Sequence, residues 1–201
     1  MRSGNRRTAT RVRDGAVQKK NNWAPDHADY MARSQSEVRI DRRSPGQGYR
    51  HLITVAHLRV LLELLPDWED AAAGLDAVVL DSGQDRMGWC DTGVVAICAW
   101  EQELWWEDCS VAFYQEHRVV LDKFEVERSK VGPDRIQVRW TEDQARAFQL
   151  LHVLPHEIGH HRDRMTTRSQ RRIARGEPYA ERYALRVMDE VWPLYTRHFA
   201  I

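Results

Sequence analysis

Two histidines one helical turn apart constrain this chain more than any other feature of its sequence. The stretch His156-Glu157-Ile158-Gly159-His160 lies in a segment predicted to be helical from Glu142 to about Met165. At about 100° per residue, His156 and His160 lie roughly 40° apart around such a helix, so both imidazoles face the same way. Two imidazoles placed in this way can bind one metal ion, with bonds of about 2.0–2.1 Å to zinc.

Glu157 lies next to this arc on the predicted helix, about 60° from His160. It cannot easily bind the ion as well, but it can touch a water molecule bound there. Zinc lowers the pKa of such a water toward about 7, and a neighbouring carboxylate can take its proton. The motif therefore predicts a hydrolytic zinc site with Glu157 as general base, while Gly159 would let another element approach the helix closely.

A hydrolytic zinc site needs a third protein ligand and an open fourth position. Glu177 and Glu181 lie four residues apart at the start of a second predicted helix, which runs from about Pro178 to Val191, so they share one face. One of them can bind zinc while the other accepts a hydrogen bond from a ligand histidine. The residues alone leave open which acid has which role.

The motif H-E-x-G-H followed by E-x-x-A-[D/E/N]-x-[F/Y]-A, which here ends at Ala184, resembles the gluzincin metallopeptidases, in particular the small gluzincins that include bacterial repressor-cleaving peptidases. The resemblance covers about residues 141–190. It implies a zincin-like fold and hydrolysis of peptide bonds by a zinc-bound water that Glu157 activates. It also implies Glu177 as the third zinc ligand and Glu181 as the acid that orients His156. Two departures from the pattern, Pro178 directly after Glu177 and a gap of only 16 residues between His160 and Glu177, keep Glu181 as the alternative ligand.

Other polar residues near the motif have more than one interpretation. His152 shares the face of His156 and is expected in the core or behind the ligands, since a fourth protein ligand would close the site. Asp163 either orients His160 or lies in solvent. Four residues are candidates for stabilising an oxyanion by residue type only, and each is also consistent with a structural or surface role: His161, Tyr183, Tyr195 and His198.

Two further groups are candidates for contacting a substrate. Trp105 and Trp106 could line a cleft, although packing in the core is the usual role of such residues. The arginine-rich stretch 162–175 could bind an acidic substrate or phosphates, or could be a solvated loop.

The spacing of apolar residues predicts short strands followed by helices. Leucines at helical spacing predict a helix that begins after Thr54 and ends before Pro66. Thr141 and Gln144 form a predicted capping box before the helix that carries the histidines, and Pro155 should kink or split that helix. Strands are expected at 77–80, 93–100, 111–114, 118–126 and 135–140. This order predicts an α+β domain with a small mixed or antiparallel sheet.

Charge is distributed unevenly, although 30 Lys/Arg balance 30 Asp/Glu over the whole chain. Residues 1–50 hold 12 basic and 5 acidic residues, and no apolar period appears before residue 49. We therefore expect a disordered basic arm at 1–48 and a folded domain at 49–201. Such an arm is a candidate for nucleic-acid binding, but it could also fold back on the domain or remain a solvated tail.

The remaining composition narrows the class of protein. No apolar run reaches the roughly 18 residues of a membrane span, and no signal peptide is recognisable, so a cytoplasmic location without a membrane partner is expected. The three cysteines contain no C-x-x-C pair and are expected to be buried thiols. The sequence thus predicts a zinc-dependent peptidase acting on a peptide or protein. The alternative is a non-cleaving, zincin-like module that binds a protein or nucleic acid.

Overall fold

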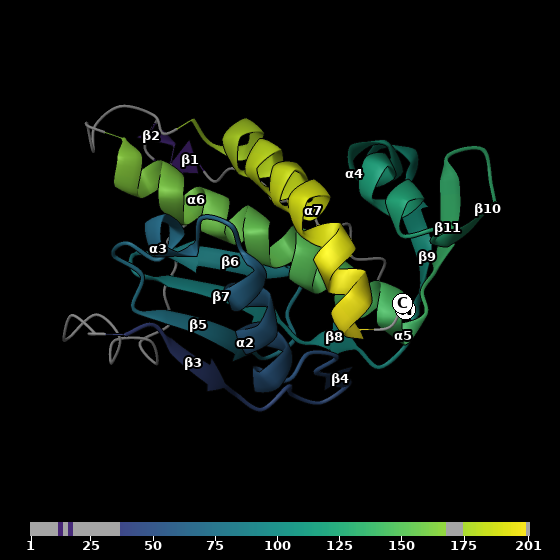
Figure 1. Cartoon of the computed structure of the whole chain (residues 1–201). Helices are drawn as coiled ribbons and strands as arrows, with labels where there is room; N and C mark the ends of the chain where they lie inside the picture. The colour runs from purple at the N-terminus through teal and green to yellow at the C-terminus, as the bar shows by residue number, and fades with distance from the viewer. Residues whose placement is uncertain (1–11, 14–15, 18–36, 168–174, 200–201) are drawn as a thin grey trace.

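The computed structural model describes residues 12–13, 16–17, 37–167 and 175–199, which form helices and small sheets (Figure 1). The main sheet has four strands in the spatial order β3 (Arg39–Arg42), β5 (Ala77–Asp81), β7 (Val94–Cys98) and β6 (Gly88–Asp91). The first three run parallel, whereas β6 runs antiparallel to β7 at one edge. The predicted α+β class with a small mixed sheet is therefore confirmed at this coarse level.

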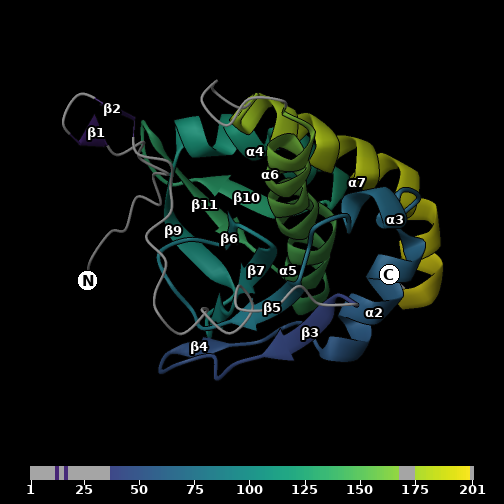
Figure 2. The same cartoon turned by 90° about the vertical axis from the view of Figure 1, so that its left-hand side faces the viewer.

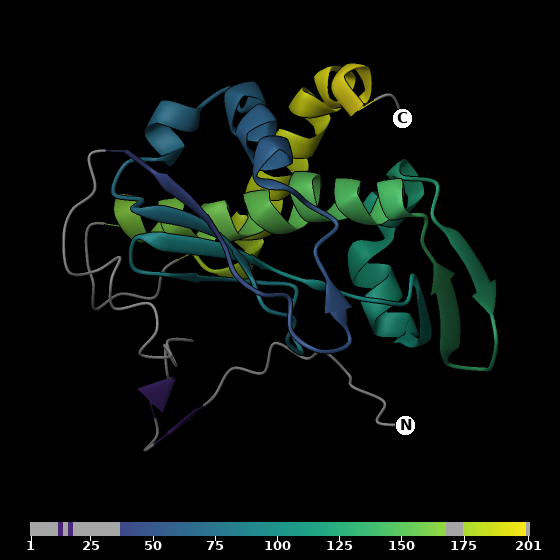
Figure 3. The same cartoon turned by 90° about the horizontal axis from the view of Figure 1, so that it is seen from below.

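Smaller sheets flank the main one. Strands β10 (Glu127–Lys130), β11 (Arg135–Arg139) and β9 (Trp105–Ser110) form an antiparallel sheet. With α4 (Val111–Lys123), they make up one end of the molecule (Figures 1 and 3). Two pairs of short strands complete the described strands: β4 (Tyr49–Arg50) with β8 (Trp100–Glu101), and β1 (Val12–Arg13) with β2 (Ala16–Val17).

The helices other than α4 gather on one face of the main sheet (Figures 2 and 3). They are α2 (Val55–Leu64), α3 (Trp68–Ala71), α5 (Glu142–Phe148), α6 (Leu154–Thr166) and α7 (Glu177–Phe199). Alternate residues of β5 and β7, such as Leu80 and Ile97, join the core beneath these helices. The intervening residues form a second buried cluster around Trp89, so both strands are buried on both faces.

Two helix starts follow directly from local sequence. Thr54 caps α2, and its hydroxyl accepts a hydrogen bond from the backbone N–H of His57 at 3.1 Å. Thr141 caps α5 in the same way, accepting from Gln144 N at 3.2 Å, while the Gln144 side chain accepts from Thr141 N at 2.9 Å. Both predicted starts, including the capping box at Thr141, are confirmed.

The strands predicted at 111–114 and 118–126 are wrong, because residues 111–123 form helix α4. Ser110 caps this helix by accepting a hydrogen bond from Phe113 N at 3.2 Å. Phe113, Val120, Leu121 and Phe124 pack into the core, and their spacings of seven, four and three residues are helical. The β-branched and aromatic residues of this stretch favour strands by propensity, but the buried residues recur at the spacing of a helix.

Pro155 and Pro193 have different effects on the helices that contain them. Pro155 follows a π-helical turn at Gln149–Val153, which separates α5 from α6, so the predicted irregularity is confirmed. Pro193 was expected to lie beyond the last helix, but α7 continues through it to Phe199. The final turns are held by packing, because Tyr195 is fully buried and stacks on Phe199 with ring centroids 4.4 Å apart.

The stretch 1–48, expected to be a disordered arm, contains β3. This strand pairs along its length with β5, and Val38 and Ile40 pack against the core. The folded unit therefore begins before residue 49, since pairing with a distant strand supplies the order that the local sequence does not predict. Most of the proposed arm, and with it the suggested nucleic-acid contact, lies outside the described residues.

Removal of β3 should cost stability that removal of the preceding residues does not. We expect a chain lacking residues 1–48 to be less stable than one lacking residues 1–36, by at least about 2 kcal/mol. The difference reflects the lost ladder with β5 and the lost burial of Ile40. Urea titration of the two truncated chains measures it, and equal midpoints and slopes would contradict the role given to β3.

Two other expectations from composition concern thiols and membranes. Cys90, Cys98 and Cys109 are free thiols; the latter two are buried and Cys90 is half-buried. Within the described part of the chain, no helix combines the length and the apolar character that crossing a membrane requires.

Candidate metal centre

The helices α6 and α7 cross at a very close contact. A Cβ atom built on Gly159 would lie 2.8 Å from the Cα of Ala180 and 3.1 Å from its carbonyl oxygen. Only glycine fits this position, so Gly159 lets the backbones approach as the sequence suggested. The crossing places the first turn of α7 beside the histidines of α6.

Substitution of Gly159 should therefore disturb both folding and metal binding. Gly159→Ala forces the added methyl group against the backbone of Ala180, and we expect a loss of about 1–3 kcal/mol in stability. Metal affinity should fall as well, because α7 must move away from α6. Thermal melting and zinc titration measure both effects.

Gly132→Ala is a suitable control, since the nearest neighbour of its added Cβ would lie at an ordinary 3.5 Å. Equal losses of stability and zinc affinity in the two variants would contradict this account.

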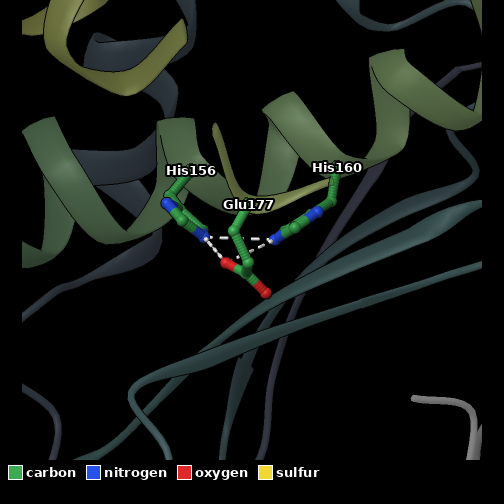
Figure 4. A group of neighbouring side chains, drawn as sticks. All are labelled: His156, His160 and Glu177. Atoms are coloured by element: carbon green, nitrogen blue, oxygen red, sulfur yellow. Dashed lines mark hydrogen bonds and ion pairs between the residues drawn. The ribbon is translucent and has the colours of Figure 1, made fainter. Parts of the chain in front are cut away.

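Three side chains meet at this crossing with their ligand atoms turned toward one another (Figure 4). The Nε2 atoms of His156 and His160 are 3.1 Å apart. An oxygen of Glu177, Oε2, lies 3.1 Å from the first and 3.4 Å from the second. His156 and His160 come from consecutive turns of α6, and Glu177 is the first residue of α7.

This triangle has the size that a zinc ion requires. Ligand atoms at about 2.0–2.1 Å from a tetrahedral ion lie about 3.3–3.4 Å from each other. The three distances of 3.1–3.4 Å are close to this value. The donor set of two imidazoles and one carboxylate also suits zinc, and it leaves the fourth position for a water or a substrate. The residues present therefore fit a zinc ion.

Glu181 meets the opposite nitrogen of the same histidine. Its Oε2 atom lies 3.3 Å from His156 Nδ1, while Glu177 lies beside Nε2. A carboxylate in that place fixes the orientation of a ligand imidazole and makes it a stronger donor. Of the two acids left open by the sequence, Glu177 lies beside both Nε2 atoms and Glu181 lies on the Nδ1 side of His156.

The two acids also affect the protonation of His156. Burial alone would lower the pKa of His156, but hydrogen bonds with Glu177 and Glu181 raise it to about 10. Burial acts to raise the pKa of Glu181, yet the hydrogen bond with His156 and the nearby His152 hold it below its usual value. The two carboxylates thus favour the protonated form of His156. A metal cation must displace that proton to bind.

Glu157, on α6, packs against the edge strand β6 of the main sheet. A Cβ atom on Gly88 of β6 would come within 2.9 Å of Glu157 Cγ, so the two residues are in close contact. Among the described strands, β6 is the last of its sheet and is paired only on its inner side. Sequence reasoning missed β6, although Thr92-Gly93 is a two-residue turn between β6 and β7, with Gly93 at φ 72°.

The four residues considered for oxyanion stabilisation lie elsewhere. His161 is buried, with Nε2 2.9 Å from the carbonyl oxygen of Ala73, and the hydroxyl of Tyr183 donates to Asp67 at 3.0 Å. Tyr195 and His198 are 18 and 21 residues beyond Glu177 on α7, which places them about 27–32 Å along the helix. None of the four belongs to the metal-binding group.

Among the remaining candidates, His152 and Asp163 are described by the structure, whereas the two tryptophan side chains and three of the arginines are not. His152 is buried beside Phe148, with Nε2 3.8 Å from Glu181, so it lies behind the ligands, as expected. Asp163 is buried too, but it contacts Gly176 and Arg175 rather than His160. The side chains of Trp105 and Trp106, and the arginines at 168, 171 and 172, lie outside the described residues.

Comparison with protein-family models, with curated proteins and with solved structures finds no match to this chain.

Proposed function

We propose that this protein is a zinc-dependent peptidase, with His156, His160 and Glu177 as the metal ligands. The observation that carries the proposal is the triangle of ligand atoms at 3.1–3.4 Å, with Glu157 next to one ligand on the same helix. A zinc ion held there would lower the pKa of a water toward about 7 and polarise a carbonyl group.

The residues of the chain then have separate tasks. Glu157 accepts a proton from the attacking water and passes it to the departing amine, as a general base that becomes a general acid. Glu181 keeps the ring of His156 in the orientation that binds the metal. Glu157 is half-buried, and its Cγ packs against Gly88 of the edge strand β6.

The position of β6 supports a peptide as substrate. An extended chain can add to an exposed strand edge through backbone hydrogen bonds. Because β6 is the outermost strand of the described sheet and its Gly88 touches Glu157, a peptide paired with it would pass beside the general base. Glycine at this point lets β6 pack closely against Glu157, since a Cβ atom there would lie 2.9 Å from Glu157 Cγ.

Digestion of a proteome-derived peptide pool tests the proposal. The expected result is a set of new peptide termini that appear with the wild-type protein, disappear with 1,10-phenanthroline and return when zinc is added back. Zinc binding without new termini under all conditions would instead favour the non-cleaving binding module.

A further inference from the structure

Asp163 is the most deeply buried charged group close to the metal-binding residues. It lies on α6, three residues after His160, and only 1% of its side chain is exposed. A buried carboxylate is costly unless hydrogen bonds and an opposite charge compensate it. The residues that bind the Asp163 carboxylate therefore indicate its structural role.

All of these partners lie at the end of α6 or just before α7. The carboxylate accepts hydrogen bonds from Arg175 Nε at 2.7 Å, from Gly176 N at 2.8 Å and from the Thr167 hydroxyl at 3.2 Å. Burial acts to raise the pKa of Asp163, but the contacts with Arg175 and Gly176 outweigh it and lower the pKa. Asp163 is thus ionised at neutral pH and bound to the two residues that precede Glu177.

Gly176 is the residue that sets where α7 begins. Its φ of 67° turns the chain into the helix, and its carbonyl oxygen accepts hydrogen bonds from the N–H groups of Tyr179 at 3.0 Å and Ala180 at 3.2 Å. The N–H group of a residue that precedes a helix, such as Gly176, has no partner within the helix, so a contact from outside can fix the position of the helix start. Asp163 supplies such a contact immediately before Glu177.

We infer that Asp163 is a positioning residue for the metal site: by holding Arg175 and Gly176, it fixes Glu177 opposite His156 and His160. The inference rests on the proposed function, since it concerns the same metal ligands. Asp163 touches neither the metal ligands nor the reacting atoms, and it acts only through the start of α7.

A matched contact between the same two helices provides the control. Asp67 accepts hydrogen bonds from Arg162 of α6, from Arg186 of α7 at 2.9 Å and from the Tyr183 hydroxyl of α7 at 3.0 Å. It joins α6 and α7 as Asp163 does, but well beyond the first turn of α7. Asp67→Asn therefore measures the general effect of loosening this helix pair.

The test is a double-mutant cycle in the full-length chain. Zinc affinity is measured by competition with a chromophoric chelator for Asp163→Asn and Asp67→Asn, each in the wild-type and the Glu177→Ala background. Visible absorption of the cobalt-loaded proteins reports ligand geometry, and melting of the metal-free proteins reports stability. Arg175→Gln, which changes a half-exposed partner of Asp163, is measured in parallel in case Asp163→Asn does not fold.

Asp163→Asn should weaken zinc binding by about 10–100-fold and alter the cobalt spectrum, as loss of a supporting group around a metal site typically does. Arg175→Gln should show the same pattern with a smaller loss. Asp67→Asn should lower the melting temperature but leave affinity within about 3-fold of wild type. In the Glu177→Ala background, Asp163→Asn should add almost nothing, because the residue through which it acts is gone.

Three results would overturn the inference. The first is wild-type affinity in the folded Asp163→Asn or Arg175→Gln protein, and the second is an equal loss with and without Glu177. The third is an equal loss in Asp67→Asn. A wild-type chain that binds no zinc would instead refute the proposed function itself, so the two failures are distinguishable.

Discussion

Glu177→Ala is expected to lose its zinc during ordinary dialysis, whereas Glu181→Ala should keep much of it. Glu177 lies opposite both Nε2 atoms and would bind the ion directly, so its loss removes one of three protein ligands. Glu181 contacts only His156 Nδ1, and loss of an acid in that position typically weakens binding or activity by about 10–100-fold. Zinc content after dialysis separates the two variants.

Glu190→Ala is the control for this pair, since it removes a third acid of α7 that pairs with Arg186, away from the site. It should keep its zinc. If Glu181→Ala lost the metal while Glu177→Ala retained it, the ligand role would belong to Glu181. Full zinc and activity in both variants would place the third ligand elsewhere and refute the gluzincin-like assignment.

Glu157→Gln is expected to retain zinc and to lose at least about 100-fold in the rate of peptide hydrolysis. The amide keeps the size of the carboxylate and its contact with Gly88, but it cannot accept a proton from water. Rates on a peptide identified from the pool digestion, with zinc content measured on the same samples, check both parts.

The matched variant is Glu190→Gln, which makes the same chemical change on the exposed face of α7 and should leave the rate unchanged. Loss of zinc from Glu157→Gln would mean that Glu157 is a ligand. Hydrolysis at the wild-type rate would show that another group transfers the proton.

The local parts of this structure could be predicted from the sequence because they depend on neighbouring residues. The caps at Thr54 and Thr141 each involve a backbone N–H three residues away. The pairing of His156 with His160 depends only on the pitch of a helix. For the same reason, the interruption before Pro155 could be expected from the ring of that residue alone.

Features that depend on distant contacts could not be predicted in this way. The strand β3 exists because Ile40 and its neighbours pair with β5, nearly 40 residues later. The run after Ser110 contains residues that favour strands, yet packing of Phe113, Val120 and Leu121 selects a helix. Local propensity was overridden in both places by tertiary contacts.

The choice between Glu177 and Glu181 shows where sequence reasoning about the candidate site ends. Both acids lie on the same face of α7, so their spacing cannot separate them. Their difference lies in which nitrogen of His156 each one meets, and that depends on how α7 is placed on α6. The close contact of Gly159 with Ala180 and the hydrogen bond from Gly176 to Asp163 determine this placement.

The central claim, that His156, His160 and Glu177 form a zinc site, is tested most directly by metal analysis. The protein is purified without metal-affinity resin, and its zinc content is measured by mass spectrometry beside that of a His156→Ala/His160→Ala double variant. We predict about one zinc ion per wild-type chain and none in the double variant, with a lower melting temperature after chelation because only the folded state binds the ion. A wild-type chain without zinc, whose melting is unchanged by chelator, or a double variant that keeps its zinc, would contradict the account.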